Sequence, residues 1–165
     1  MTQYRSSWQR GKEIQEKIPK LDPLKSGVIV GFTMGEGSFF VTINPCKTIK
    51  IGYQVKPIFM IKLIRTDSEI LQHIQKWLGC GHVHFSEKAV AFRVSKLTDL
   101  VEIIIPFFDQ HPLLNIKRKD FTLFKIICYK VLHGEGRTKE GLNKILTIRD
   151  LMNNGGHVRR RKIKL

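Results

Sequence analysis

The spacing of apolar and polar residues predicts a helix followed by a β-hairpin in the first part of the chain. Asp22-Pro23 is typical of a helix start, with Asp22 as N-cap, and the uncharged stretch that follows ends near Gly35. Residues 38–44 and 52–63 are rich in β-branched and aromatic side chains, and the turn-like residues 45–50 separate them. These two segments are predicted to be antiparallel strands.

The same pattern then repeats with a second helix and a second hairpin. Apolar residues in 67–78 follow the i, i+3, i+4 spacing of an amphipathic helix, which Gly79 closes. Residues 81–85 and 89–94 alternate around a short turn, and 97–108 forms another apolar helical pattern. The predicted fold class is α+β, with the element order αββαββα.

Two further helices are predicted after this unit, at residues 115–132 and 138–152. We divide the chain into a basic N-terminal arm (1–20), a single domain (21–152) and a basic C-terminal tail (153–165). The sequence contains no internal repeat, so each feature is present once.

The charge balance narrows the class of partner. The chain has 29 Lys and Arg against 14 Asp and Glu among 165 residues, a net charge of +15. Nucleic acid is the first candidate partner, and a basic protein without such a partner is the alternative. No apolar run is long enough for a membrane span, and the first twenty residues lack the apolar stretch of a secretory signal. The three cysteines have unrelated spacings, which favours a reducing, intracellular location.

Three glycines share one face of the first predicted helix. Gly27, Gly31 and Gly35 recur at every fourth position, and each costs about 0.5 to 1 kcal/mol of helix stability relative to alanine. Close approach of another helix along this face would offset that loss. The alternative is a weak helix or a loop.

A single carboxylate follows this glycine face. Glu36 lies between Gly35 and Gly37, and it is the only acidic residue between Asp22 and Asp67. A carboxylate gains nothing from the dipole at a helix C-terminus, where cations are favoured. A hard metal ion prefers carboxylate and carbonyl oxygens as ligands. We therefore interpret Glu36, with the Gly35 carbonyl, as a metal-binding pair.

The segment IVGFTMGEGSF, residues 29–39, resembles the LAGLIDADG motif, with Glu36 at its last acidic position. The likeness continues in GYQVKPIF (52–59), FRVS (92–95) and PLLNIKRKDF (112–121), so that it covers about residues 23–152. Met34 stands where many members carry an acid that catalysis does not require. The chain is similar to the single-motif, homodimeric, intron-encoded homing endonucleases.

This resemblance implies a saddle-shaped antiparallel sheet that follows the major groove of duplex DNA, with extra helices at the C-terminus. It implies a homodimer in which the motif helices meet through Gly27 and Gly31. Glu36 and Gly35 of each subunit would bind Mg²⁺, or Mn²⁺ or Ca²⁺ in the same site, for hydrolysis of one strand of a pseudo-palindromic site. Family members act in mitochondria or chloroplasts.

The resemblance also assigns two basic residues to the active site. Lys117 occupies the position of the family's active-site lysine, with Lys119 as the alternative. Family members often carry a polar group at the end of the second strand, but this chain has Leu63 there. Arg65 is the substitute that we predict, and a solvated arginine is the alternative.

Alternation along the strands predicts which side chains face DNA, because residues two apart share a face. Side chains on that face are candidates for contacts with base edges, and loop lysines for contacts with phosphates. The predicted DNA-binding residues are Ser38, Phe40, Thr42, Asn44, Lys47, Lys50, Gln54, Lys56, His82, His84, Ser86 and Arg93.

Three other interpretations stay open at this stage. Cys80, His82 and His84 alternate like zinc ligands, although no fourth ligand is evident. An intron maturase that binds RNA would use the same basic surface. A DNA-binding protein without cleavage activity is the third alternative, but Glu36 has no purpose in it.

Overall fold

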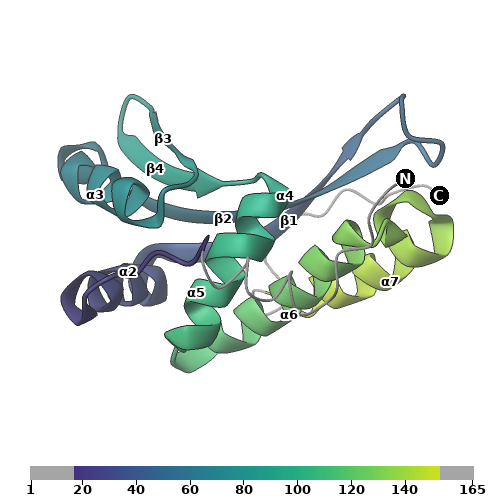
Figure 1. Ribbon diagram of the computed structural model, residues 1–165. Coiled ribbons are helices and arrows are strands. Elements are labelled where there is room, and N and C mark those ends of the chain that lie inside the picture. Colours follow the sequence, from purple (N-terminus) through teal and green to yellow (C-terminus); the bar gives the residue numbers. More distant parts are fainter. Residues whose placement is uncertain (1–16, 153–165) are drawn as a thin grey trace, which may run out of the picture.

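The computed structural model describes residues 17–152, and the predicted order of helices and strands is present in it (Figure 1). Helix α2 spans Pro23–Glu36. The Asp22 side chain accepts a hydrogen bond of 2.9 Å from the backbone N–H of Lys25, which caps the first turn as predicted. Strand β1, Gly37–Pro45, follows α2 without a loop.

The four strands form one antiparallel sheet. Its members are β1, β2 (Tyr53–Ile64), β3 (His82–Phe85) and β4 (Ala89–Val94), in the order β1-β2-β4-β3. The hairpins β1–β2 and β3–β4 rise at opposite ends of the sheet, and the helices lie beneath it (Figure 1). This arrangement is the predicted saddle.

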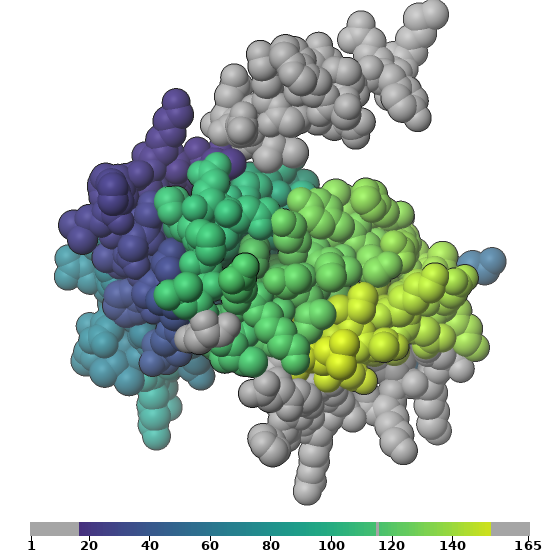
Figure 2. Space-filling view, turned by 90° about the horizontal axis from the view of Figure 1, so that it is seen from below, coloured from purple at the N-terminus to yellow at the C-terminus, as the bar shows by residue number. Residues whose placement is uncertain are grey.

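The hydrophobic core lies between the sheet and the helices. Phe39 is fully buried, and its ring lies 5.0 to 5.7 Å from those of Phe59, Phe108, Phe121 and Phe124. Helix α3, Ser68–Leu78, adds apolar side chains to this core and ends at Gly79, whose φ of 66° is left-handed. Seen from below, α2 and the helices α5 (Ile105–Gln110), α6 (Asn115–Leu132) and α7 (Lys139–Asp150) lie over this side of the molecule (Figure 2).

The helix predicted at 97–108 is not one regular helix. The structure divides it into α4 (Leu97–Asp99), a π-helical turn η2 (Leu100–Ile104) and α5 (Ile105–Gln110). The N–H of Ile105 bonds to the carbonyl of Leu100, five residues earlier. Pro106 has no N–H and its ring crowds the preceding turn, so the helix widens just before it.

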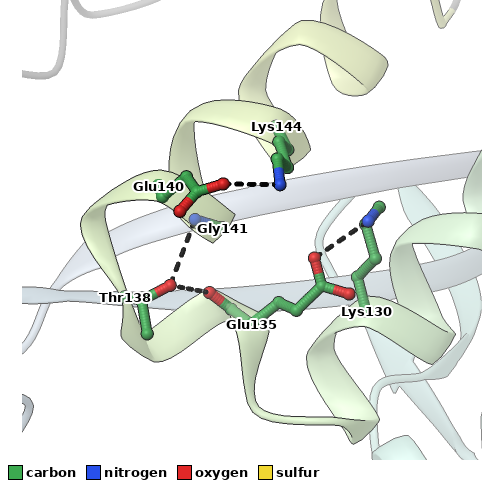
Figure 3. A network of polar contacts seen from close by, with 6 residues as sticks. All are labelled: Lys130, Glu135, Thr138, Glu140, Gly141 and Lys144. Atoms are coloured by element: carbon green, nitrogen blue, oxygen red, sulfur yellow. Dashed lines mark hydrogen bonds and ion pairs between the residues drawn. The ribbon is translucent and has the colours of Figure 1, made fainter.

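The C-terminal helices form a hairpin that packs beneath the sheet (Figure 1). Helix α6 spans Asn115–Leu132, a single turn η3 spans Glu135–Arg137, and α7 spans Lys139–Asp150. Ion pairs Lys130–Glu135 (2.8 Å) and Glu140–Lys144 (2.7 Å) flank the connection, and Thr138 caps α7 by accepting from the Gly141 N–H (Figure 3). Both predicted helices are therefore present.

Residues at the end of the predicted N-terminal arm contact the domain. Lys17 forms a 2.6 Å ion pair with Glu102, and Ile18 is buried. Residues 1–16 and the predicted tail 153–165 lie outside the described residues. Within 17–152, every helix is too short or too polar to cross a lipid bilayer.

Candidate functional site

The junction between α2 and β1 presents the predicted carboxylate. Glu36 is exposed, and no residue in the part described by the structure forms a hydrogen bond or ion pair with its carboxylate. Gly37 is required here, because a Cβ on it would lie 2.5 Å from the Thr33 carbonyl oxygen. The chain therefore passes from helix to strand at Gly37 and leaves the Glu36 side chain available to a ligand.

Lys117 lies at the same junction, although it is 80 positions away from Gly37 in the chain. It belongs to the first turn of α6, and its Nζ donates a hydrogen bond to the Gly37 carbonyl. The bond fixes the ammonium group one residue from Glu36. The structure thus brings together the two residues to which the sequence assigned the main catalytic roles.

Glu36 also lines an open depression of about 460 Å³ at the end of β2. Its other lining residues come from the end of β2, the turn before α3, the β3–β4 turn and the start of β4. They are Lys62, Leu63, Ile64, Asp67, Lys88 and Ala89. The depression thus holds two lysines and a second carboxylate near Glu36.

Lys62 was missed by the sequence analysis, which compared position 63 with the family pattern. Leu63 packs against the core, whereas Lys62 is exposed on the other face of β2. The signal was present in the alternation of β2, because Lys62 has the same parity as Lys56, which had been assigned to the open face. Lys62 is the basic side chain that β2 contributes to the depression.

The structure does not place Arg65 with Glu36. Arg65 belongs to the 3₁₀ turn η1, Arg65–Asp67, and is not among the residues that line the depression. Its Nη1 donates a 3.2 Å hydrogen bond to the Ser86 carbonyl, and its backbone N–H bonds to the Lys88 carbonyl. These contacts join the end of β2 to the β3–β4 turn, which is a structural role.

The donors around Glu36 fit one half of a metal site. The negative end of the α2 dipole adds to the charge of the carboxylate and attracts a cation, and Gly35 is exposed beside it. No group of three or more His, Cys, Asp or Glu side chains that could hold a metal occurs within residues 17–152. A divalent ion at Glu36 therefore needs further ligands from water, DNA phosphate or a second protein unit.

Within the described residues, 17–152, the glycine face of α2 is open. Gly27 and Gly31 are exposed, and a Cβ on either would meet no atom within 4 Å. Leu24, on the same side of the helix, is 77% exposed. Ile29 and Thr33 are fully buried on the opposite side. Helix α2 thus buries one face in the domain and leaves a second, apolar and flat face open.

The open face of the sheet carries most of the predicted DNA-binding residues. Cross-strand pairs place them in rows: Asn44 with Gln54, Thr42 with Lys56, and Ser38 with Met60, Arg93 and His82. His84 follows on β3, paired with Ala91. None of the four strands contains Asp or Glu. The strands therefore give this face positive charge and no negative charge.

Three of the predicted DNA-binding residues lie outside the strands. Lys47 and Lys50 are exposed in the β1–β2 loop. Ser86 lies in the β3–β4 turn, where its hydroxyl donates to the Ala89 carbonyl and accepts from the Ala89 N–H. The Ser86 side chain therefore closes the turn. The two lysines are free to approach a phosphate backbone.

The geometry does not favour the zinc interpretation. Cys80 is buried, and burial raises the pKa of its thiol to about 12. His82 and His84 are both exposed, with ring centroids 6.3 Å apart. The thiol is thus held away from the surface to which both imidazoles belong.

The LAGLIDADG endonuclease family model matches residues 29–128. Probable intron-encoded endonuclease 2 of Neurospora crassa is 38% identical over 135 residues, which cover 80% of this chain and 30% of that protein. The uncharacterized mitochondrial protein RF1 of Saccharomyces cerevisiae is 26% identical over 127 residues, 76% of this chain and 25% of that protein. The chain spans less than a third of the length of these curated relatives.

Solved structures extend the likeness to three dimensions. The homing endonuclease I-TnaI is 39% identical, with a TM-score of 0.75 over 80% of this chain and 90% of that chain. I-SmaMI bound to an uncleaved DNA target in the presence of calcium ions is 30% identical, with a TM-score of 0.76 over 83% of this chain and 46% of that chain. Taken with the motif at the α2–β1 junction, these matches show that the chain belongs to the LAGLIDADG family of homing endonucleases.

Proposed function

We propose that this protein is a sequence-specific homing endonuclease that makes a metal-dependent double-strand break in duplex DNA. The observation that carries the proposal is the exposed Glu36 carboxylate, one residue from the Gly37 carbonyl to which Lys117 donates, at the edge of a sheet whose strands contain no acidic side chain. A protein that only bound DNA would gain nothing from a carboxylate at that edge, because it repels phosphate.

Duplex DNA fits the open face of the sheet better than intron RNA does. The major groove of B-form DNA admits a two-stranded β-ribbon, whereas that of A-form RNA is too deep and narrow for side chains to reach the bases. Lys56, Lys62 and Arg93 supply positive charge along this face. We assign base contacts to the strand residues and phosphate contacts to Lys47, Lys50 and Lys88.

Glu36 and the Gly35 carbonyl are the ligands that this chain offers to a divalent ion, most simply Mg²⁺. Such an ion supplies an activated water and neutralises charge on the scissile phosphate. Lys117 holds a positive charge next to this site, because its hydrogen bond to Gly37 restricts its position. Lys62, across the depression, offers a second charge to the phosphate as it becomes more negative.

Cleavage of both strands requires two such sites, so we propose that two units pair through α2. Gly27 and Gly31 permit close helix approach, and they present an apolar surface that a partner helix would cover. A unit of this size matches 90% of the I-TnaI chain but only 46% of the I-SmaMI chain. We favour a homodimer, whose two-fold symmetry would select a pseudo-palindromic site.

We place the activity in mitochondria, because one relative is named as a mitochondrial protein and another as intron-encoded. Fluorescent tagging in the source cells tests this location. A nuclear signal alone would contradict it.

Replacement of Glu36 by Gln tests the central proposal. The substitution keeps the shape of the side chain and removes its charge, so cleavage of a duplex selected from a random library with Mg²⁺ should fall by about a thousandfold or more. DNA affinity, measured in Ca²⁺, should stay within about twofold of wild type. Wild-type cleavage by Glu36→Gln would overturn the assignment.

Replacement of Gly31 by Leu tests the pairing. The larger side chain should hold the two helices apart and give a folded monomer that cannot break both strands. Thr122→Leu is the matched control, because it adds the same side chain at an exposed position of α6. Sedimentation with and without DNA measures the assembly. A Gly31→Leu variant that pairs and cleaves normally would contradict this interface.

A further inference from the structure

Three apolar side chains lie in the middle of the open face of the sheet. We define the apolar patch as Phe40, Ile58 and Met60. Phe40 and Ile58 are cross-strand partners, and Met60 is the next residue of β2 on the same face. Ile58 is buried, with 1% of its surface exposed, whereas Phe40 and Met60 are partly exposed and lie outside the core cluster on the opposite face. The apolar patch is therefore a second apolar region of the sheet.

The fold alone does not account for the apolar patch. Phe40 and Met60 remain partly exposed, whereas Phe39 and Phe59, their neighbours in the two strands, are fully buried in the core. Exposed apolar surface gains free energy only when a ligand removes it from water. A surface that bound phosphates alone would need only polar or basic side chains here. The patch thus indicates a ligand with an apolar group.

The surroundings of the apolar patch indicate the charge of that ligand. Towards the β1–β2 loop the next row is Thr42 with Lys56. In the other direction Arg93 is the cross-strand partner of Met60, and its Nε is buried without a hydrogen-bond partner among the described residues. The four strands carry no acidic side chain. The expected ligand is an anionic polymer that presents an apolar group between polar ones.

We propose that the apolar patch recognises thymine through its C5-methyl group in the major groove, with Phe40 and Met60 as specificity-determining residues. This inference rests on the proposed function, because it requires duplex DNA on the open face. The methyl group of thymine is the apolar group that a base pair presents in the major groove, and aromatic and aliphatic side chains contact it. Recognition here comes from contact with the methyl and not from a hydrogen bond.

The register of the sheet also positions this thymine within the DNA site. Successive residues on one face of a strand are about 7 Å apart, and base pairs are stacked about 3.4 Å apart, so neighbouring rows lie about two base pairs apart. Phe40 is one row from Ser38 and Arg93 and one row from Thr42 and Lys56. Because Met60 shares the row of Arg93 and Phe40 lies in the next row, the thymine should lie within about two base pairs of the base that Arg93 contacts, on the side towards Lys56.

Replacement of thymine by deoxyuridine tests the inference, because deoxyuridine lacks only the methyl group. Duplexes selected from a random library would be resynthesised with each thymine replaced in turn, and the affinity of wild-type protein would be measured in Ca²⁺. One or two adjacent positions in each half-site should lose affinity by about fourfold, the effect of one buried methyl group. Other positions should change little.

Variants connect the effect to the patch. Phe40→Ala and Met60→Ala should bind thymine and deoxyuridine duplexes equally, whereas Thr42→Ala, one row away on the same face, should still distinguish them. Deoxyuridine tolerated at every position, or selected sites without thymine at the expected one, would overturn this inference while the proposed function stands. Failure of the protein to bind or cut any duplex would instead overturn the proposed function.

Discussion

The two faces of the sheet are built from alternate residues of the same strands, but their side chains have different surroundings. Phe39 points into the core and is fully buried among four other phenylalanine rings. Phe40, the next residue, lies on the open face outside the core. On the core face the side chains pack against each other. On the open face they can contact a bound molecule.

This difference separates stability from recognition. The core face fixes the backbone, so side chains on the open face can change with little effect on the fold. The residues that we propose as catalytic belong to neither face, because Glu36 and Lys117 lie where helices end or begin beside the sheet. In this proposal rigid elements hold the reactive groups, and the open face selects the DNA that is bound.

The largest effect expected from this comparison is on stability. Phe39→Ala removes a ring from the centre of the core and should lower the free energy of unfolding by about 3 to 5 kcal/mol. Phe40→Ala, one residue away, should lower it by less than about 1 kcal/mol, because Phe40 is outside the core. Urea denaturation measures both variants. Equal losses would show that the two faces are not separate.

The alternation that distinguishes these faces was readable in the sequence. The period of two placed Ser38, Phe40, Thr42 and Asn44 on the open face, and the cross-strand register agrees with that assignment. Asp22, Gly79 and the short hairpin turns were recognisable because each has a local chemical cause. Caps and turns depend on residues that are neighbours in the chain, so the sequence alone predicts them.

The next largest effect concerns catalysis. Lys117→Ala removes a fixed positive charge beside Glu36 and should slow cleavage by about a hundredfold. DNA affinity should fall far less, because one exposed phosphate contact contributes little to it. Lys119→Ala is the matched control, since Lys119 is an exposed lysine of the same helix. Equal losses of rate and affinity would show that Lys117 is a plain phosphate contact.

Features that depend on distant segments could not be derived in the same way. The hydrogen bond from Lys117 to the Gly37 carbonyl joins α6 to the motif, and it was not predicted; the family resemblance had only assigned Lys117 to the active site. The sequence predicted the helix at 97–108 but not its π-helical turn before Pro106, because that distortion depends on how the helix packs. Lys62 was overlooked because the family pattern directed attention to position 63. The alternation of β2 would have placed Lys62 on the open face.

A smaller effect is expected at Gly37, where helix α2 passes into strand β1. Gly37→Ala would place a Cβ 2.5 Å from the Thr33 carbonyl, so the backbone must shift. We expect a loss of about 1 to 3 kcal/mol in the free energy of unfolding, together with slower cleavage as Glu36 moves. Gly31→Ala is the control for thermal unfolding alone, because its Cβ would meet no atom within 4 Å. Cleavage by Gly37→Ala is compared with that of the wild-type protein.

The smallest effect is expected at Asp22, an exposed residue at the start of α2. Asp22→Ala removes the N-cap and should lower Tm by about 2 to 4 °C at pH 7 without changing the cleavage rate of bound DNA. Hydrogen bonds from the side chain and backbone of Lys25 lower the pKa of Asp22 below its ordinary value of 3.8. The capping carboxylate therefore stabilises the fold above that value, and its contribution is lost as the pH falls through the lowered pKa. The difference in Tm between the two proteins should shrink below about pH 4. A difference that stayed constant down to pH 2 would show that the charge of Asp22 has no part in holding the helix.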